Sequence, residues 1–217
     1  MSIFGSSPSP SKPGSFGGFS FPSGESLGMV WVRDRGTKGH SGWKQLGDAR
    51  GRVAIPPEKE VMLQIKPETQ PDLSPLASFE PGAIHTLDLW DTKITDGDLV
   101  HLRGLTGLQG LNLSRTKLTN TGLNYLAGLH GLTILNLYGT QITDDGLMAL
   151  AGMTQLLTLW INKTAVTDAG FTHVKKLTAL KELYIADTAI TENGKNDFKR
   201  AVPACQVRSG KGSVWSY

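Results

Sequence analysis

Residues 108–131 read LQGLNLSRTKLTNTGLNYLAGLHG, and residues 132–155 repeat the same pattern as LTILNLYGTQITDDGLMALAGMTQ. Five such copies follow one another without a gap. Each copy begins 24 residues after the one before it, at Ile84, Leu108, Leu132, Leu156 and Leu180. A fixed period of this length is typical of a solenoid, in which every repeat buries its apolar face against its neighbours. The repeats therefore predict one continuous array over residues 84–203.

Each copy has two halves with different hydrophobic periods. In the first half apolar residues alternate, as Leu135 and Leu137 do, and this period predicts a strand with one buried face. In the second half apolar residues fall three apart, as in Leu147, Leu150 and Met153, which suits one face of a short helix. Stacked copies then form an α/β solenoid with one parallel sheet and a layer of short helices on the opposite side.

Polar residues and glycines recur at fixed positions of the copies. Thr143 is expected to cap a helix, with Asp144 in its first turn and Gly152 as a left-handed C-cap. Neighbouring copies have the same residue types at most of these positions. Thr also fills the ninth position of every copy, at Thr92, Thr116, Thr140, Thr164 and Thr188. We expect these hydroxyl groups to satisfy backbone groups at the bend after each strand.

The shared pattern, LxxLxLxxTxITDxGLxxLxxLxx, closely resembles the leucine-rich repeat family. The variant is bacterial-looking, with Thr where the commonest repeats have Asn, and the resemblance covers somewhat more than half of the chain. It implies a right-handed leucine-rich repeat solenoid with parallel strands on the concave face and short helices outside. Leucine-rich repeat proteins generally bind partners on that concave face.

Residues 28–83 lack the repeat but contain strand patterns, and we interpret them as an N-terminal β-rich cap over the first repeat. Residues 52–55 and 61–65 are predicted to form a β-hairpin across a turn that contains Pro56 and Pro57. Leu63 lies 24 residues before Leu87, so the second of these strands takes the place of a degenerate repeat. Trp31 and Trp43 are expected in the core of the cap itself.

The two ends of the chain are predicted to contribute little to the core. Residues 1–27 are rich in Gly, Ser and Pro, and we expect a disordered tail whose Phe residues could alternatively dock on another protein. Residues 204–217 are expected to form a short closing strand followed by a tail. Cys205 is expected to be a small buried residue in that strand.

Charge and cysteine content limit the classes of function. The chain carries a net charge of +3, and its repeat array contains 11 basic and 11 acidic residues, so a nucleic-acid partner is not expected. Six basic residues between Arg33 and Arg52 form either a patch for an acidic partner or an ordinary solvated face. A single cysteine, no secretory signal and no apolar stretch long enough to span a membrane favour a cytoplasmic protein.

The sequence contains no recognisable catalytic, cofactor-binding or metal-binding set. His101 and His173 share one repeat position but lie three repeats apart. Asp96, Asp144 and Asp168 could suggest a column of cation ligands, but acids at the start of helices explain them better. We therefore expect no enzyme activity, no cofactor and no metal.

The concave face supplies the candidate binding residues, because the positions between buried strand residues are free of the repeat's own packing. Large aromatic side chains are enriched at the centres of interfaces. The candidate partner-binding residues are Trp90, Arg115, Asn136, Tyr138, Trp160, Asn162 and Tyr184. We expect these side chains to face solvent, with Trp160 and Tyr184 about 5 Å apart on adjacent strands.

The predicted function is that of a non-catalytic protein-interaction module whose protein partner is unknown. Two alternatives stay open: an adaptor that links an enzyme to its target, and a carbohydrate- or ligand-binding protein that uses the concave aromatic residues. Aromatic residues on a strand face could also serve strand pairing alone.

Overall fold

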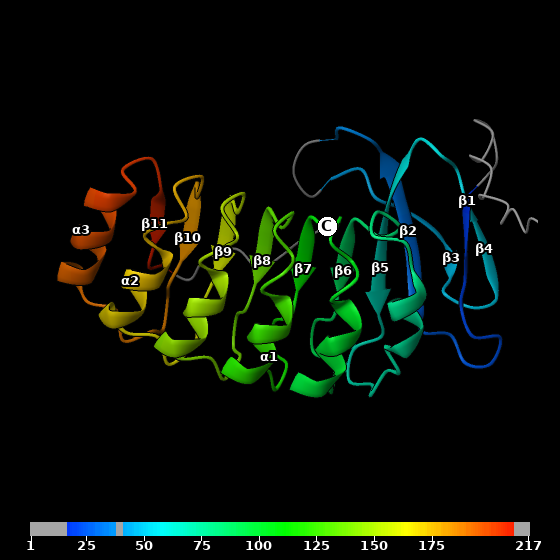
Figure 1. Cartoon of the computed structure of the whole chain (residues 1–217), viewed down its shortest axis with the longest axis horizontal. Helices are drawn as coiled ribbons and strands as arrows, with labels where there is room; N and C mark the ends of the chain where they lie inside the picture. Colours follow the sequence, from blue (N-terminus) through cyan, green and yellow to red (C-terminus); the bar gives the residue numbers. More distant parts are fainter. Residues whose placement is uncertain (1–16, 38–40, 211–217) are drawn as a thin grey trace, which may run out of the picture.

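Nine strands of the computed structural model, which describes residues 17–37 and 41–210, form one sheet along the length of the molecule (Figure 1). The strand order is β11-β10-β9-β8-β7-β6-β5-β2-β3, and a separate sheet pairs β1 with β4. The strands are β1 (Gly17–Ser20), β2 (Gly28–Asp34), β3 (Lys44–Asp48), β4 (Arg52–Ile55), β5 (Lys59–Ile65), β6 (Thr86–Asp88), β7 (Gly110–Asn112), β8 (Ile134–Asn136), β9 (Thr158–Trp160), β10 (Glu182–Tyr184) and β11 (Gln206–Arg208).

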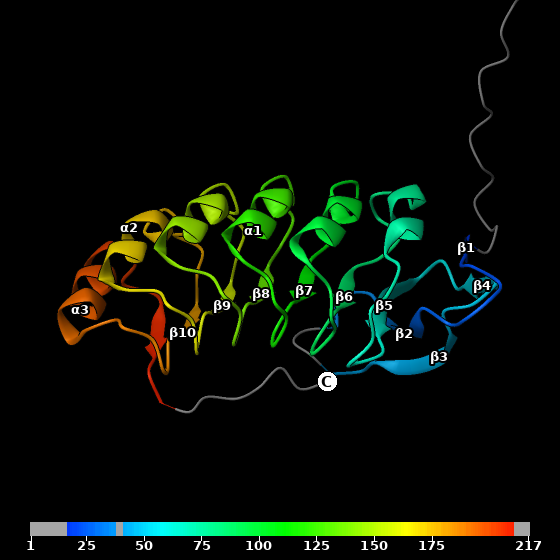
Figure 2. The ribbon, with the colours of Figure 1, turned by 90° about the horizontal axis from the view of Figure 1, so that it is seen from below.

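Short helices cover the convex side of this sheet, and the strands line the concave side (Figure 2). The helices are η1 (Ser74–Ser78), η2 (Asp96–Leu102), α1 (Asn120–Leu126), η3 (Asp144–Leu150), η4 (Asp168–Gly170), α2 (Phe171–Val174) and α3 (Glu192–Ala201), of which the η elements are 3-10 helices. None of the helices in the described part of the chain is long and apolar enough to cross a membrane. The predicted leucine-rich repeat solenoid is confirmed.

The central leucine column shows how the repeats share one core. Parallel pairing aligns residues 24 positions apart on adjacent strands, and it extends to Leu63 on β5, which pairs with Leu87 at the spacing noted in the sequence. The aligned residues are Leu63, Leu87, Leu111, Leu135, Leu159 and Leu183, and each is completely buried. Every repeat thus depends on the next to cover its apolar side chains.

The Thr column after the strands has the predicted structural role. In each copy the Thr hydroxyl donates a hydrogen bond of 2.6–2.8 Å to the carbonyl oxygen three residues earlier, as Thr140 does to Leu137. A buried carbonyl without a partner costs roughly 1–3 kcal/mol. In the first three copies the same carbonyl also accepts a longer bond of 3.3–3.4 Å from the Thr backbone N–H, so there the hydroxyl supplies the shorter of two hydrogen bonds.

A second polar column joins neighbouring repeats on the helical side. The Asp144 carboxylate accepts hydrogen bonds from both the backbone N–H and the hydroxyl of Thr167, one repeat further on, each at 2.7 Å. Equivalent pairs are Asp96 with Thr119, Asn120 with Thr143, and Asp168 with Thr191. Asp96, Asp144 and Asp168 also begin helices, as predicted, but their side chains bond mainly to the next repeat.

This polar column explains a glycine column. A Cβ atom at Gly170 would lie 2.5 Å from an oxygen of Asp144, and corresponding oxygens would lie 2.1–2.4 Å from a Cβ at Gly122, Gly146 and Gly194. Only glycine leaves room for the preceding repeat's acid or amide. In the first copy Asp98 stands at this position, and its own carboxylate accepts hydrogen bonds from the Thr95 backbone and hydroxyl.

The predicted left-handed C-caps are wrong. Gly104, Gly128 and Gly152 do not have a positive φ. The chain instead continues in tight turns, with the N–H of Leu129 bonded to the carbonyl of Leu126 at 2.9 Å and the same bond in the adjacent copies. A 3-10 type bond satisfies the last carbonyls of the helix without a left-handed residue.

The prediction that residues 1–27 form a disordered tail is wrong for residues 17–27. Residues 1–16 lie outside the described residues, but β1 pairs with β4 in antiparallel register. Phe21 is buried, and Phe19 stacks on Phe79 with ring centroids 5.1 Å apart. Residues 17–27 are therefore structured, because their Phe residues bury apolar surface against the array. That residues 28–83 act as a cap stays a prediction.

The predicted hairpin between β4 and β5 is also wrong. β5 pairs with β2 on one side and with β6 on the other, so neither of its edges is open to β4. The two tryptophans expected in the cap core are only half-buried. Trp31 donates a hydrogen bond to Gln64, and Trp43 packs beneath the Arg33 guanidinium, so both rings lie at the surface of the sheet.

The C-terminal end of the sheet contains a short strand. β11 pairs in parallel with β10 and closes that end of the sheet. Cys205 is buried, as expected, and burial raises the pKa of its thiol to about 11, so it stays protonated at neutral pH. Residues 211–217 of the predicted tail lie outside the described residues.

Candidate functional site

The concave face carries two rows of side chains from strands β6 to β10. The first row is in register across the sheet and consists of Asp88, Asn112, Asn136, Trp160 and Tyr184. The second row lies two residues further along each chain segment and consists of Trp90, Ser114, Tyr138, Asn162 and Ala186. The strands thus bring the predicted binding residues onto one surface.

The N-terminal half of the first row supports the backbone and does not face solvent. The side-chain oxygens of Asp88, Asn112 and Asn136 each accept a hydrogen bond of 2.9–3.1 Å from the backbone N–H two residues later. These side chains are at most 2% exposed. The prediction that Asn136 faces solvent is therefore wrong, because the end of each strand needs this acceptor.

Asp88 differs from its neighbours in this row by its charge. Burial raises the pKa of its carboxyl, while hydrogen bonds from the Trp90 backbone, Gln64 and Asn112 lower it and only partly compensate. Desolvation disfavours the charged form of a carboxyl group. The first repeat thus has a titratable carboxyl group where the second and third have neutral amides.

The C-terminal half of the first row contains an aromatic pair. The rings of Trp160 and Tyr184 stack with centroids 5.0 Å apart and planes 10° from parallel, so the predicted spacing is confirmed. Each side chain is only 5% exposed, and the prediction that they face solvent is wrong. Stacking covers one face of each ring, and Arg208 lies 5.7 Å from the Tyr184 ring.

The second row supplies the more accessible groups. Trp90 is 37% exposed, and Tyr138 is half-buried with the ammonium group of Lys163 positioned 5.5 Å from its ring centroid. Contact with Tyr138 raises the pKa of Lys163. Asn162 is buried, and among the described residues its Oδ1 is a buried oxygen without a hydrogen-bond partner.

The bend next to the second row has a left-handed backbone. Four non-glycine residues in this column have φ between 52° and 60°, namely Asp91, Arg115, Lys163 and Asp187, and Gly139 completes it. The backbone N–H groups of Asp91, Arg115, Gly139 and Lys163 each donate a hydrogen bond to a carbonyl of the next repeat, as Arg115 does to Tyr138. The Arg115 side chain is 57% exposed and lies 3.4 Å from Asp91.

The structure therefore divides the predicted residues into two groups. Trp90, Arg115 and Tyr138 are accessible, together with Lys163, which the sequence-based prediction did not include. Asn136, Trp160, Asn162 and Tyr184 are buried beneath or beside them. The position of Lys163, one residue after the second row in the same column as Arg115, was the signal that could have identified it.

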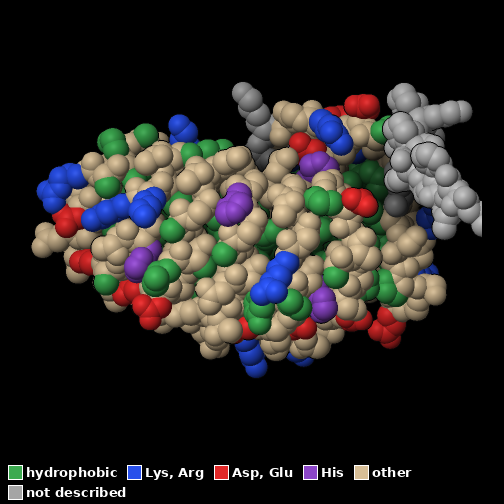
Figure 3. Space-filling model, in the orientation of Figure 1, with side chains coloured by type: hydrophobic (Ala, Val, Ile, Leu, Met, Phe, Trp, Pro, Cys, Tyr) green, Lys and Arg blue, Asp and Glu red, His purple; other side chains and the backbone are tan. Residues whose placement is uncertain are grey.

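This surface offers contact chemistry: aromatic faces, two cations and hydrogen-bonding groups. In residues 17–37 and 41–210 no three His, Cys, Asp or Glu side chains cluster as metal ligands would. These groups on the concave face suit recognition of another molecule. Figure 3 shows the opposite, helical side, on which acidic and basic side chains are interspersed and a hollow lined by hydrophobic side chains opens at the N-terminal end.

Comparison with known proteins identifies the repeats. The family model for leucine-rich repeats matches residues 83–142. No curated protein matches the chain closely enough to count as a relative.

Solved structures share the fold. An internalin C2 from Listeria monocytogenes superposes with a TM-score of 0.56 at 27% identity, covering 68% of this chain and 70% of the internalin. An internalin, InlF, from the same organism gives a TM-score of 0.55 at 20% identity over 70% of this chain, which spans 47% of the length of that protein. TLR13 in a complex with ssRNA13 superposes with a TM-score of 0.53 at 16% identity over 90% of this chain, which spans 24% of the TLR13 chain.

Proposed function

Because the chain belongs to the leucine-rich repeat family, we propose that its concave sheet face binds a protein partner. Proteins of this family are generally non-catalytic binding modules, and the internalins and TLR13 share the fold. The observation that carries the proposal is the accessible row formed by Trp90, Arg115, Tyr138 and Lys163. Neither the leucine core nor the Thr column requires aromatic or cationic side chains at these positions.

The local chemistry favours a protein over a carbohydrate. A sugar ring binds on an open aromatic face, but Trp160 and Tyr184 stack on each other and are 95% buried. Trp90 and Tyr138 lie in different repeats and are flanked by Arg115 and Lys163. Separated aromatic anchors with charged neighbours suit the side chains and backbone of a protein.

We place this interaction in the cytoplasm. Cys205 is the single cysteine of the chain and is buried, so the ends of the array are not held by an internal disulfide. Disulfide bonds are common in proteins of oxidising compartments and rare in the cytosol. An adaptor role would need a second, separate site for another partner.

The proposal is tested by affinity capture from the native host, followed by titration calorimetry with the captured protein. Truncating an aromatic anchor at an interface centre commonly costs about 2 kcal/mol, which corresponds to a loss of roughly thirtyfold in affinity. We expect Tyr138→Ala and Trp90→Ala each to weaken binding by about that factor.

The matched control is Met148→Ala, because Met148 is 58% exposed on the helical side. Trp160→Ala and Tyr184→Ala are also expected to weaken binding, but their burial requires a thermal melt of each variant alongside. Normal binding by the two accessible aromatic variants, with loss in Met148→Ala, would move the interaction to the convex side.

A further inference from the structure

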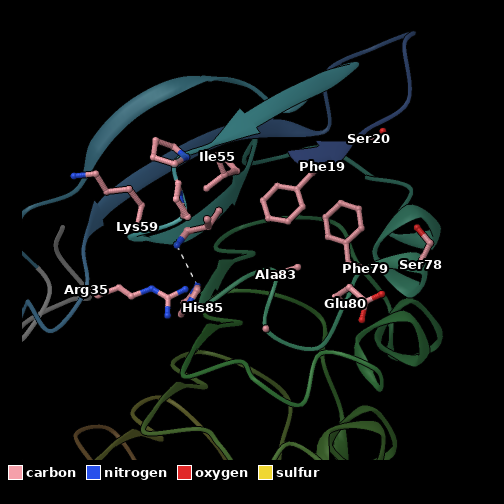
Figure 4. Close-up of a pocket in the computed structure, with 14 residues that line it drawn as sticks. Phe19, Ser20, Arg35, Ile55, Lys59, Ser78, Phe79, Glu80, Ala83 and His85 are labelled. Atoms are coloured by element: carbon pink, nitrogen blue, oxygen red, sulfur yellow. Dashed lines mark hydrogen bonds between the residues drawn. The ribbon is translucent and has the colours of Figure 1, made fainter. Parts of the chain in front are cut away.

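A cavity of about 480 Å³ lies at the N-terminal end of the molecule, between the β1–β4 sheet and the first repeat (Figure 4). Phe19 and Ile55 line it from the small sheet, Phe79 lines it from the segment directly after η1, and His85 lines it from the start of the first repeat. Volumes of 300–1,000 Å³ are typical of small-molecule sites. This cavity is separate from the concave surface and plays no part in the function proposed above.

One wall of the cavity is apolar, with the exposed carboxylate of Glu80 at its edge. The rings of Phe19 and Phe79 stack 5.1 Å apart, and Ile55 extends this wall along the small sheet. In Figure 4 the two rings lie side by side at the edge of the open space, with Glu80 below Phe79. A hydrocarbon or aryl group placed here would replace water against apolar surface, at roughly 25 cal/mol per Å² of buried area.

The opposite end presents hydrogen-bond donors. Arg35 and Lys59 lie there with His85, away from Phe19 and Phe79 (Figure 4). Lys59 pairs with Asp34, whereas Arg35 is exposed and has no ion-pair partner among the described residues. The site therefore has one uncompensated positive charge at this end.

His85 adds a neutral donor to this positive end. The backbone N–H of Val61 donates to Nδ1 of His85 at 3.2 Å, which assigns the ring proton to Nε2. Burial lowers the pKa of His85, and the nearby Arg35 and Arg33 lower it further against the opposing effect of Glu60, so the ring is neutral at pH 7. A neutral ring that accepts at Nδ1 can still donate to an anion.

We propose that this cavity binds a small monocarboxylate with an aryl or alkyl body. The carboxylate would contact Arg35, with Lys59 and His85 close by, and the body would lie against Phe19 and Phe79. Charge-assisted hydrogen bonds between a guanidinium and a carboxylate are among the stronger polar contacts in proteins. Such a ligand touches both the small sheet and the first repeat, so it would also hold the two together.

The test titrates the full chain with 4-phenylbutyrate and, separately, with its uncharged analogue 4-phenylbutyramide. Calorimetry measures affinity, and NMR shifts of the His85 ring report on the position of the ligand. We expect the carboxylate to bind at least about tenfold more tightly than the amide, because only the carboxylate pairs with Arg35. Arg35→Gln should reduce this preference to less than about threefold.

Lys117→Gln is the matched control, because Lys117 is an exposed cation on the array outside the cavity. It should keep the full preference for the carboxylate. Equal binding of acid and amide, an unchanged preference in Arg35→Gln, or no binding of either compound at about 10 mM would each overturn the proposal. Tighter binding of acetyl-Gly-Gly-Phe than of 4-phenylbutyrate would also overturn it and identify a peptide C-terminus as the occupant.

Discussion

The repeat array and the N-terminal β region reach a buried core in different ways. In the array, each strand of three residues pairs in parallel with neighbours of the same length, and the same kinds of contact recur 23 or 24 residues apart. In the N-terminal region, seven-residue strands β2 and β5 pair in antiparallel register, and three Phe residues from distant segments pack together. Periodic contacts can be predicted from one repeat, whereas the contacts between distant segments cannot.

The largest expected effect belongs to the leucine column of the array. Leu135→Ala should lower the free energy of unfolding by about 2–5 kcal/mol, because it opens a cavity in a core that two neighbouring repeats share. Urea denaturation followed by circular dichroism measures this loss. Leu46→Ala is the control from the N-terminal region, since Leu46 is 40% exposed on the edge strand β3. Equal losses from the two variants would contradict the assignment of the buried face.

A somewhat smaller effect is expected from the Phe cluster of the N-terminal region. Phe21→Ala should lower the free energy of unfolding by about 3 kcal/mol, the low end of the range for a buried Phe, because Phe21 packs against Phe19 and Phe79 but keeps 6% of its surface exposed. Denaturation should be followed by both tryptophan fluorescence and circular dichroism. An unchanged midpoint would support the disordered tail predicted from the sequence and contradict the structured β1.

The polar column between repeats should contribute less than either core. Asp144→Ala removes two hydrogen bonds to Thr167 and should cost about 1.5–3 kcal/mol, the usual range for hydrogen bonds to charged groups. Asp145→Ala removes the adjacent acid, whose carboxylate makes no hydrogen bond within the described part of the chain, and should cost less than about 0.5 kcal/mol. Equal losses measured by urea denaturation would show that both acids act only through the helix dipole.

The smallest effect concerns the charge of Asp88 and appears only in the pH dependence of stability. Because burial raises the folded-state pKa of Asp88, the folded protein holds this proton to higher pH than the unfolded chain does. The protein should therefore lose stability relative to Asp88→Asn as the pH rises from the unfolded pKa, near 3.8, through the raised folded value.

This difference is measured by urea denaturation of both proteins between pH 3 and pH 7. Asn112→Ser, in the next repeat, is the control, because neither side chain titrates in this range. A constant difference between wild type and Asp88→Asn across the range would show that the folded-state pKa is not raised.

Much of the array could be predicted from the sequence because its contacts are periodic. The alternation around Leu135 and the constant 24-residue spacing back to Leu63 predicted both the strands and their register. The Thr-Asp-x-Gly pattern also contains the residues of the inter-repeat hydrogen bonds. The acid of one copy accepts hydrogen bonds from the Thr of the next copy and lies against its Gly. That contact could have been inferred from the co-occurrence of Thr, Asp and Gly in the third and fourth copies, with Asn120 in place of the acid in the second.

The candidate binding surface was harder to predict. Strand alternation correctly placed Trp160 and Tyr184 on the concave side, but their exposure depends on which side chains stand beside them in the sheet. The two rings stack and become buried, whereas Trp90 is more exposed. The pairing of β1 with β4 has no periodic signal, because the two segments lie more than thirty residues apart and share no sequence pattern.

Site-specific photo-cross-linking tests most directly whether the concave face is the binding surface. Tyr138 is replaced by p-benzoylphenylalanine in one protein and Met148, on the convex side, in another, and each is irradiated in a lysate of the native host. We expect a discrete cross-linked protein adduct from position 138 and none from position 148, with both proteins melting at similar temperatures. An adduct from position 148 alone would contradict it.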